Sequence, residues 1–197
     1  FTFVFEFGVS GDPINDFLYC WFAIGLPEEL VKIIPVLLLL KFSKHVNEPY
    51  DYILYGSVAA LGFAFTENLL YYQEDALTNI SARALSAVVA HMFFTSIVTY
   101  GMLLNKYKLK RNPILNFIFF FVIAAAAHGF YDFWLINKWG QQFSFITVIF
   151  FLMSIHFWTI FKSNALNNST FYDPKVQINN TKLKSFIVVV LVGIVLT

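Results

Sequence analysis

The 197-residue sequence has little charge, because only 13% of its residues are Asp, Glu, Lys or Arg. A soluble domain usually carries about 25% charged residues. This shortage excludes a soluble enzyme, a disordered tail and a nucleic-acid-binding protein as first interpretations, so we expect no nucleic-acid partner. Cysteine is also scarce: Cys20 stands alone, so no disulfide can form within the chain.

Hydrophobic residues make up 58% of the chain and aromatic residues 20%. A membrane-spanning helix needs about 20 mostly apolar residues. We predict such spans at residues 17–40, 50–72, 82–104, 114–136 and 143–161, with a sixth that begins near residue 183. Residues 1–7 resemble the end of an earlier span, and we expect the sequence to be a fragment.

Backbone polar groups in lipid must form hydrogen bonds within their own segment, so each span is predicted to be a helix. The expected fold is an all-α, polytopic transmembrane helical bundle of about six to seven spans, with the first and last truncated. We therefore expect an integral membrane protein whose surroundings are the lipid bilayer.

The basic residues predict the orientation of the bundle. Ten Lys and Arg residues fall in or beside the connectors on one side, and only Arg83 and Lys138 fall on the other. The ten are Lys41, Lys44, Lys106, Lys108, Lys110, Arg111, Lys162, Lys175, Lys182 and Lys184. Because loops rich in Lys and Arg remain in the cytoplasm, the opposite side is predicted to be extracytoplasmic.

Four consecutive spans carry polar residues that are costly in a membrane, which makes them candidates for a functional site. They are Glu28, Glu29, Lys32, Glu67, Asn68, His91, His128 and Asp132. At about 1.5 Å per residue, the carboxylates and histidines of this set lie near the middle of their spans or are displaced toward the extracytoplasmic side. This shared depth predicts one hydrated pocket that opens toward that side.

Helical spacing pairs some of these residues, because positions i and i+4 share a face. Glu28 can meet Lys32 as an ion pair, which is also compatible with a purely structural role. His128 can meet Asp132, either as a carboxylate that orients an imidazole or as two ligands of one metal.

Small residues predict close packing between the same spans. Gly62, Gly129 and the four alanines at 124–127 would let neighbouring helices approach each other.

Two routes to water activation fit this set of residues. In the metal route, Glu67, His91 and His128 hold a divalent ion, most simply zinc, and Glu28 or Glu29 acts as the general base. Asp132 is a further candidate ligand because it can meet His128. The predicted metal set comprises Glu67, His91, His128 and Asp132.

The second route needs no metal and no cofactor. Glu28 or Glu29 removes a proton from water directly, while His128 and Asn68 stabilise the oxyanion. The HExxH motif of many zinc proteases does not occur in the sequence. The residues by themselves leave both routes open.

Four motifs together resemble the PrsW family of intramembrane proteases, a distant relative of the CAAX prenyl protease and bacteriocin-immunity superfamily. PEELVK at 27–32 resembles the family's EExxK motif, and FAFTEN at 63–68 resembles FxxxEN. His91 lies where a third motif is expected, and HGFYD at 128–132 resembles HxxxD. The resemblance covers about residues 17–136.

The resemblance implies a membrane-embedded protease that hydrolyses a peptide bond of a membrane-anchored protein substrate near the extracytoplasmic side. In the family's name-giving member, that substrate is an anti-sigma factor, which suggests the bacterial cytoplasmic membrane. Residues 1–197 would form a single peptidase domain, with a four-helix catalytic core at 17–136 and peripheral C-terminal spans at 143–197.

Under the same resemblance, Glu28, Glu29, Glu67, Asn68 and His128 would be catalytic. The family is usually called a metalloprotease, whereas its prenyl-protease relatives are argued to use a glutamate without metal. Nothing in the sequence indicates the oligomeric state.

Two other functions use the same residues. A proton- or ion-coupled transporter also places Glu, His and Asp within its spans, although no internal repeat is visible. A catalytically idle immunity or scaffold protein of the same fold would use the polar cluster only to hold its helices together.

Overall fold

The computed structural model describes residues 8–72, 77–143, 145–173, 175 and 185. Its regular elements are all helical and run in the order α2 (Pro13–Tyr19), η1 (Cys20–Gly25), α3 (Leu26–Phe42), α4 (Pro49–Tyr72), α5 (Leu77–Leu104), η2 (Asn105–Leu109), α6 (Pro113–Ile136), η3 (Gly140–Phe143) and α7 (Phe145–Leu166). Segments η1 and η2 are π-helical, and η3 is a 3-10 turn. The predicted all-α class is confirmed.

Four of the described helical segments are long and apolar enough to cross a membrane. They are Pro49–Tyr71, Ser86–Leu109, Pro113–Ile136 and Phe145–Leu166. Residues 1–7 and nearly all of the span predicted from residue 183 lie outside the described residues. The count of six to seven spans therefore stays a prediction.

The helical stretch that contains the first predicted span, 17–40, extends beyond it at both ends and is not a uniform α-helix. It starts at Pro13, where Asp12 caps the helix by accepting hydrogen bonds from the backbone N–H groups of Ile14 and Asn15. It then passes through the π-helical η1 and continues as α3 to Phe42. A π-helical turn is wider than an α-helical turn, so η1 widens the helix immediately before the two glutamates of α3.

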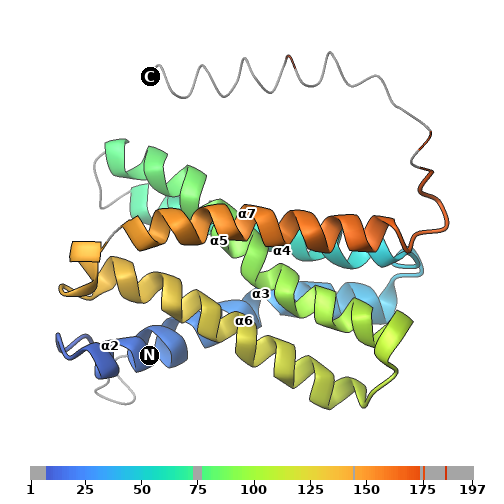
Figure 1. Ribbon diagram of the computed structural model, residues 1–197, viewed down its shortest axis with the longest axis horizontal. Coiled ribbons are helices and arrows are strands. Elements are labelled where there is room, and N and C mark those ends of the chain that lie inside the picture. Colours follow the sequence, from blue (N-terminus) through green and yellow to red (C-terminus); the bar gives the residue numbers. More distant parts are fainter. Residues whose placement is uncertain (1–7, 73–76, 144, 174, 176–184, 186–197) are drawn as a thin grey trace.

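The helices lie side by side along the long axis of the molecule (Figure 1). α2, the end of α6 and the start of α7 lie at one end of the bundle, and the α3–α4 and η2–α6 connections lie at the other. Among the candidate spans, α5 has the largest share of buried residues in its most apolar stretch, at 61%, and α7 has the smallest, at 6%. The core includes Ile33, Phe94 and Val98. α5 is therefore the central helix, around which the others place their polar residues.

The glycine predictions have different outcomes. A Cβ atom on Gly129 would lie 2.5 Å from Cα of Trp21, so Gly129 lets α6 approach the backbone of η1, as predicted. At Gly62 the packing prediction is wrong, because no described heavy atom outside the helix's own backbone lies within 4 Å of the position its Cβ would take.

A buried carboxylate joins the two chain segments at one end of the bundle. Asp16 is fully buried and accepts hydrogen bonds from the backbone N–H of Ser10 and from Nδ2 of Asn137, each at 2.8 Å. Asn137 is the C-cap residue of α6. Burial raises the pKa of Asp16, but the hydrogen bonds from Ser10, Asn137, Asn15 and Gly11 outweigh it, so the pKa lies below its ordinary value.

Candidate functional site

A pocket of 300 Å³ lies toward the end of the bundle where α4 and α6 end. Its wall includes Tyr71 near the end of α4 and Ile136 at the end of α6. The polar part of the wall consists of Glu28, Glu67, Ser86, His91, His128 and Asp132, together with the phenols of Tyr71 and Tyr131. The structure thus brings together polar residues from α3, α4, α5 and α6.

Glu29 is fully buried and lies at the centre of the polar contacts. Its Oε1 lies 2.8 Å from Nζ of Lys32 and 3.0 Å from Nδ1 of His128, and its Oε2 accepts a hydrogen bond of 2.9 Å from the hydroxyl of Thr95. A buried carboxylate is stable only when it is paired and hydrogen-bonded. Since both oxygens have partners, Glu29 is placed to fix its neighbours.

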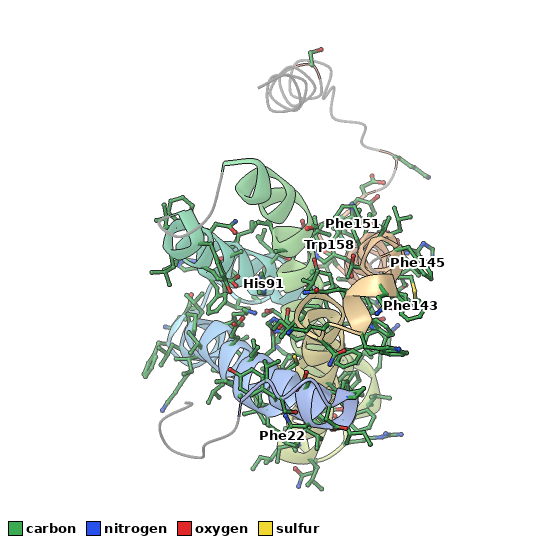
Figure 2. All side chains as sticks on the ribbon, turned by 90° about the vertical axis from the view of Figure 1, so that its left-hand side faces the viewer. Phe22, His91, Phe143, Phe145, Phe151 and Trp158 are labelled. Atoms are coloured by element: carbon green, nitrogen blue, oxygen red, sulfur yellow. The ribbon has the colours of Figure 1, made fainter. Side chains whose placement is uncertain are left out.

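Lys32 connects this carboxylate to the second histidine. Its Nζ lies 2.7 Å from Nδ1 of His91, and Nε2 of His91 lies 2.8 Å from Oε2 of Glu67. An ammonium group has only donors, so the network assigns Nδ1 of His91 as an acceptor and its Nε2–H as a donor to Glu67. Figure 2 shows His91 inside the bundle, whereas Phe22 and Phe145 lie on its outside.

The orientation of His128 follows from its two nearest neighbours. Its Nδ1 faces Glu29, and its ring stacks on Phe94 with centroids 4.7 Å apart and planes 17° apart. The other nitrogen, Nε2, faces the pocket-lining carboxylates, at 3.5 Å from Oε2 of Glu28 and 3.4 Å from Oδ2 of Asp132.

Glu28 differs from its neighbour Glu29 because it lines the pocket. Its side chain is 22% exposed, against 0% for Glu29. Its Oε2 lies 3.4 Å from Nζ of Lys32. The two adjacent glutamates therefore occupy distinct positions: Glu29 faces the protein interior, and Glu28 faces the pocket.

The donor atoms present fit a metal ion. Glu28, His91 and His128 each offer one ligand atom, and these three atoms lie within 4.8 Å of one another. Two histidines and one carboxylate match a ligand set of catalytic zinc. Two atoms that bind one zinc ion at about 2.0–2.2 Å in tetrahedral geometry lie about 3.4 Å apart, close to the 3.5 Å between Glu28 and His128.

The ligand group in the structure differs in part from the predicted set. Both histidines are shared, but Glu28 replaces Glu67, whose carboxylate contacts His91, and Asp132 lies beside His128. His91 can bind a metal through Nε2 only by giving up its contact with Glu67.

The structure also places residues that the sequence interpretation did not single out. Thr95 donates a hydrogen bond directly to Glu29, and its only sequence signal is its position four residues after His91, on the same helix face.

Asn68, which the sequence predicts to be catalytic, is half-buried beside Glu67 in α4, and the described wall of the pocket does not include it. Its catalytic role stays a prediction.

The sequence resembles known proteins over most of its length. Residues 2–159 match the family described as "PrsW family intramembrane metalloprotease". Protease PrsW of Geobacillus kaustophilus is 32% identical over 135 residues, which cover 68% of this chain and 58% of that protein. Protease PrsW of Clostridioides difficile is 30% identical over 178 residues, which cover 86% of this chain and 72% of that protein.

A third relative, Protease PrsW of Bacillus subtilis, is 27% identical over 119 residues, or 60% of this chain and 55% of that protein. The chain thus spans 58% of the Geobacillus protein's length and 55% of the Bacillus protein's. No solved structure matches the chain.

Proposed function

The chain belongs to the PrsW family of intramembrane metalloproteases, and we propose that it hydrolyses a peptide bond of a membrane-anchored protein. One observation carries the proposal. Glu28, His128 and Asp132 meet at the wall of one pocket, with 3.5 Å and 3.4 Å separating Nε2 of His128 from the two carboxylates. Peptide hydrolysis needs an activated water beside a group that stabilises the oxyanion, and these residues supply both.

The roles we assign follow from the contacts. Glu29 and Phe94 hold the His128 ring so that Nε2 faces the pocket. Without a metal, Glu28 removes a proton from water and the resulting hydroxide adds to the carbonyl carbon. The C–N bond then breaks as the proton passes from Glu28 to the leaving nitrogen. His128 stabilises the oxyanion in its doubly protonated form, because Nδ1–H is donated to Glu29 and only a second proton makes Nε2 a donor toward the pocket. Asn68 is the second predicted donor.

The same residues can serve a metal. Glu28, His91 and His128 would hold the ion, for which we propose zinc, and Glu67 and Asp132 would be the pocket-lining carboxylates left to accept the proton from water. A bound zinc ion supplies Lewis-acid activation of water and of the carbonyl oxygen. Glu28 is essential in both arrangements, as a base in one and as a ligand in the other.

We further propose that the protein lies in the bacterial cytoplasmic membrane, with this pocket on the extracytoplasmic side and an anti-sigma-factor-like substrate. The distribution of basic residues supports this orientation. Lys41, Lys44, Lys106, Lys108, Lys110 and Arg111 lie at the end of the bundle opposite the pocket, and such loops remain in the cytoplasm.

A labelling experiment in intact bacterial cells tests the orientation. Lys138→Cys and Lys44→Cys place a thiol at exposed positions at the two ends of the bundle, while the native Cys20 is fully buried. A membrane-impermeant maleimide should label the first variant only. Labelling of Lys44→Cys alone would place the pocket on the cytoplasmic side.

A second experiment tests the activity. Bacterial membranes that contain the wild-type protein should accumulate new protein N-termini that are absent with Glu28→Gln, as measured by mass spectrometry of labelled N-termini. Equal sets of N-termini would contradict a protease. Proton or cation flux in liposomes without any cleavage would favour the transporter instead.

A further inference from the structure

The hydrolytic pocket continues into a second and larger hollow between α3 and α4. This hollow has a volume of 630 Å³ and shares Glu28, Glu67 and Tyr71 with the pocket. Beyond these residues its wall is mostly apolar and includes Val31, Pro35, Ala59, Gly62 and Leu70. We call this hollow the α3–α4 groove.

The groove lies on a face of the bundle that presents apolar side chains to the surroundings. Val31 is 55% exposed, and Leu61 and Phe65, which flank the groove on α4, are 40% and 65% exposed. In a membrane these side chains face lipid. The groove is therefore positioned to accept a chain from the bilayer, while the pocket lies toward the end of the bundle.

Gly62 is a glycine in the wall of the groove, and close packing between the described helices does not account for its lack of a side chain. Gly56, on the same helix, packs against Thr99, with 2.7 Å between its would-be Cβ and the threonine hydroxyl oxygen. Gly62 has no such neighbour among the described residues. The hydroxyl of Thr66 donates to the carbonyl of Gly62 at 3.0 Å, so it is turned back onto its own helix. Among the residues that the structure describes, the wall at Gly62 is thus open and presents no side chain.

We infer that the α3–α4 groove binds an extended, apolar stretch of the substrate's own membrane-spanning segment, on the bilayer side of the bond that is cut. This inference rests on the proposed function. Along α4 the groove extends from Ala59 to Tyr71, which at about 1.5 Å per residue is about 18 Å. An extended chain of about five residues covers that length at about 3.3 Å per residue.

An extended conformation is required for chemical reasons. In a helical substrate the peptide groups are hydrogen-bonded within the helix and covered by side chains, so the segment must unwind before its carbonyl can approach Glu28. The substrate class is therefore a membrane-anchored protein with about five apolar residues, at least one facing the open surface at Gly62, adjacent to the cut.

The inference is tested by filling the groove at Gly62. Gly62→Trp places a large ring in open space, so the fold should be retained, as thermal unfolding in detergent can verify. Leu61→Trp adds the same ring at an adjacent lipid-facing position outside the described wall of the groove. Gly62→Ala adds only a methyl group and controls for loss of the glycine.

Two probes are compared in membranes that express each variant. The first is the set of bacterial membrane proteins whose new N-termini require Glu28. The second is a synthetic octapeptide that copies one of those cleaved bonds with only one residue on its bilayer side, so it is too short to extend along the groove, and it is added in detergent. We expect Gly62→Trp to lower cleavage of the membrane proteins at least tenfold more than cleavage of the octapeptide. We expect Leu61→Trp to lower neither, and Gly62→Ala to lower cleavage of the membrane proteins far less than Gly62→Trp does.

The outcomes separate the inference from the function on which it rests. If wild-type membranes contain no N-termini beyond those of Glu28→Gln, the proposed function fails. If the wild type cleaves and Gly62→Trp cleaves membrane proteins equally well, or loses both probes to the same extent, the groove does not bind the substrate's membrane segment. A Leu61→Trp variant as impaired as Gly62→Trp would overturn the inference as well.

Discussion

Nδ1 of His128 lies 3.0 Å from Oε1 of Glu29, so the buried glutamate determines which nitrogen of the histidine faces the pocket. The adjacent Glu28 points into the pocket itself. Consecutive residues on a helix are about 100° apart around its axis, which explains how two neighbouring glutamates can face different surroundings. The double glutamate therefore combines a positioning residue with the residue proposed to act on water.

The first prediction separates the two glutamates by stability. Glu28→Gln should lower cleavage by about 10²-fold or more, with the melting temperature in detergent nearly unchanged. Glu29→Gln should destabilise the fold by about 3–5 kcal/mol, because it leaves the buried Lys32 without its closest carboxylate. Thermal unfolding together with the N-terminus measurement checks both.

The control for this prediction removes both members of the buried pair. Glu29→Gln combined with Lys32→Met leaves no uncompensated charge at these positions, and such double replacements are often close to neutral for stability. The double variant should recover most of the stability lost in Glu29→Gln. A double variant that is as unstable as the single one would show that the ion pair is not the cause.

The second prediction concerns metal content. If Glu28, His91 and His128 hold zinc, elemental analysis of the purified wild type should give one zinc per chain. Glu28→Ala and His128→Ala should each lower the affinity at least tenfold, as measured by competition with a zinc chelator. The matched control is Asn116→Ala, because Asn116 lies in α6 far from this cluster and bonds to the carbonyl of Gly101. Fully active wild-type protein without metal would assign Glu28 as the base.

The class of fold and the helices of the core could be predicted from the sequence, because apolar length alone identifies spans. α6 begins at Pro113 and ends at Ile136, within one residue of the predicted 114–136. α5 continues as η2 to Leu109, where a connector was expected from residue 105. Lys106 and Lys108 in this segment increase its polarity, and hydropathy cannot distinguish a polar helix end from a loop.

Partners within the polar cluster were harder to predict than its members. Spacing of four residues suggested that Lys32 pairs with Glu28, yet Lys32 lies closer to Glu29, at 2.8 Å against 3.4 Å. The contact between Lys32 and His91 joins residues 59 positions apart. It depends on how α3 and α5 cross, which periodicity within one helix does not reveal.

The third prediction is a pH dependence at Asp16. Because its pKa in the folded protein lies below the ordinary value, its charge stabilises the fold at neutral pH. This contribution should decrease as the pH falls below the unfolded value of about 4 and disappear below the lowered pKa. Asp16→Asn should cost about 1–3 kcal/mol at pH 7, because buried donors such as Nδ2 of Asn137 lose a charged acceptor.

The measurement is thermal unfolding of wild type and Asp16→Asn in detergent at pH 7 and at pH 3. The difference between their melting temperatures should be largest at pH 7 and smaller at pH 3. Asp51→Asn is the control for loss of a carboxylate that accepts backbone hydrogen bonds. Asp51 has such bonds but lies at the opposite end of the bundle, away from Asn137. A constant difference for Asp16→Asn at both pH values would contradict the assignment.

The fourth prediction tests whether the close approach of η1 and α6 positions the site. A methyl group on Gly129 would lie 2.5 Å and 2.6 Å from Cα and N of Trp21, so Gly129→Ala must push α6 away from η1. Overpacking of this kind typically costs about 1–3 kcal/mol. Because His128 precedes Gly129, its contacts with Glu29 and Glu28 should lengthen, and cleavage should decrease even at temperatures where the variant stays folded. Gly62→Ala is the matched control for stability, since no described atom lies near its methyl group and its melting temperature should not change. If Gly129→Ala retains both wild-type stability and wild-type cleavage, the packing of η1 against α6 does not position His128.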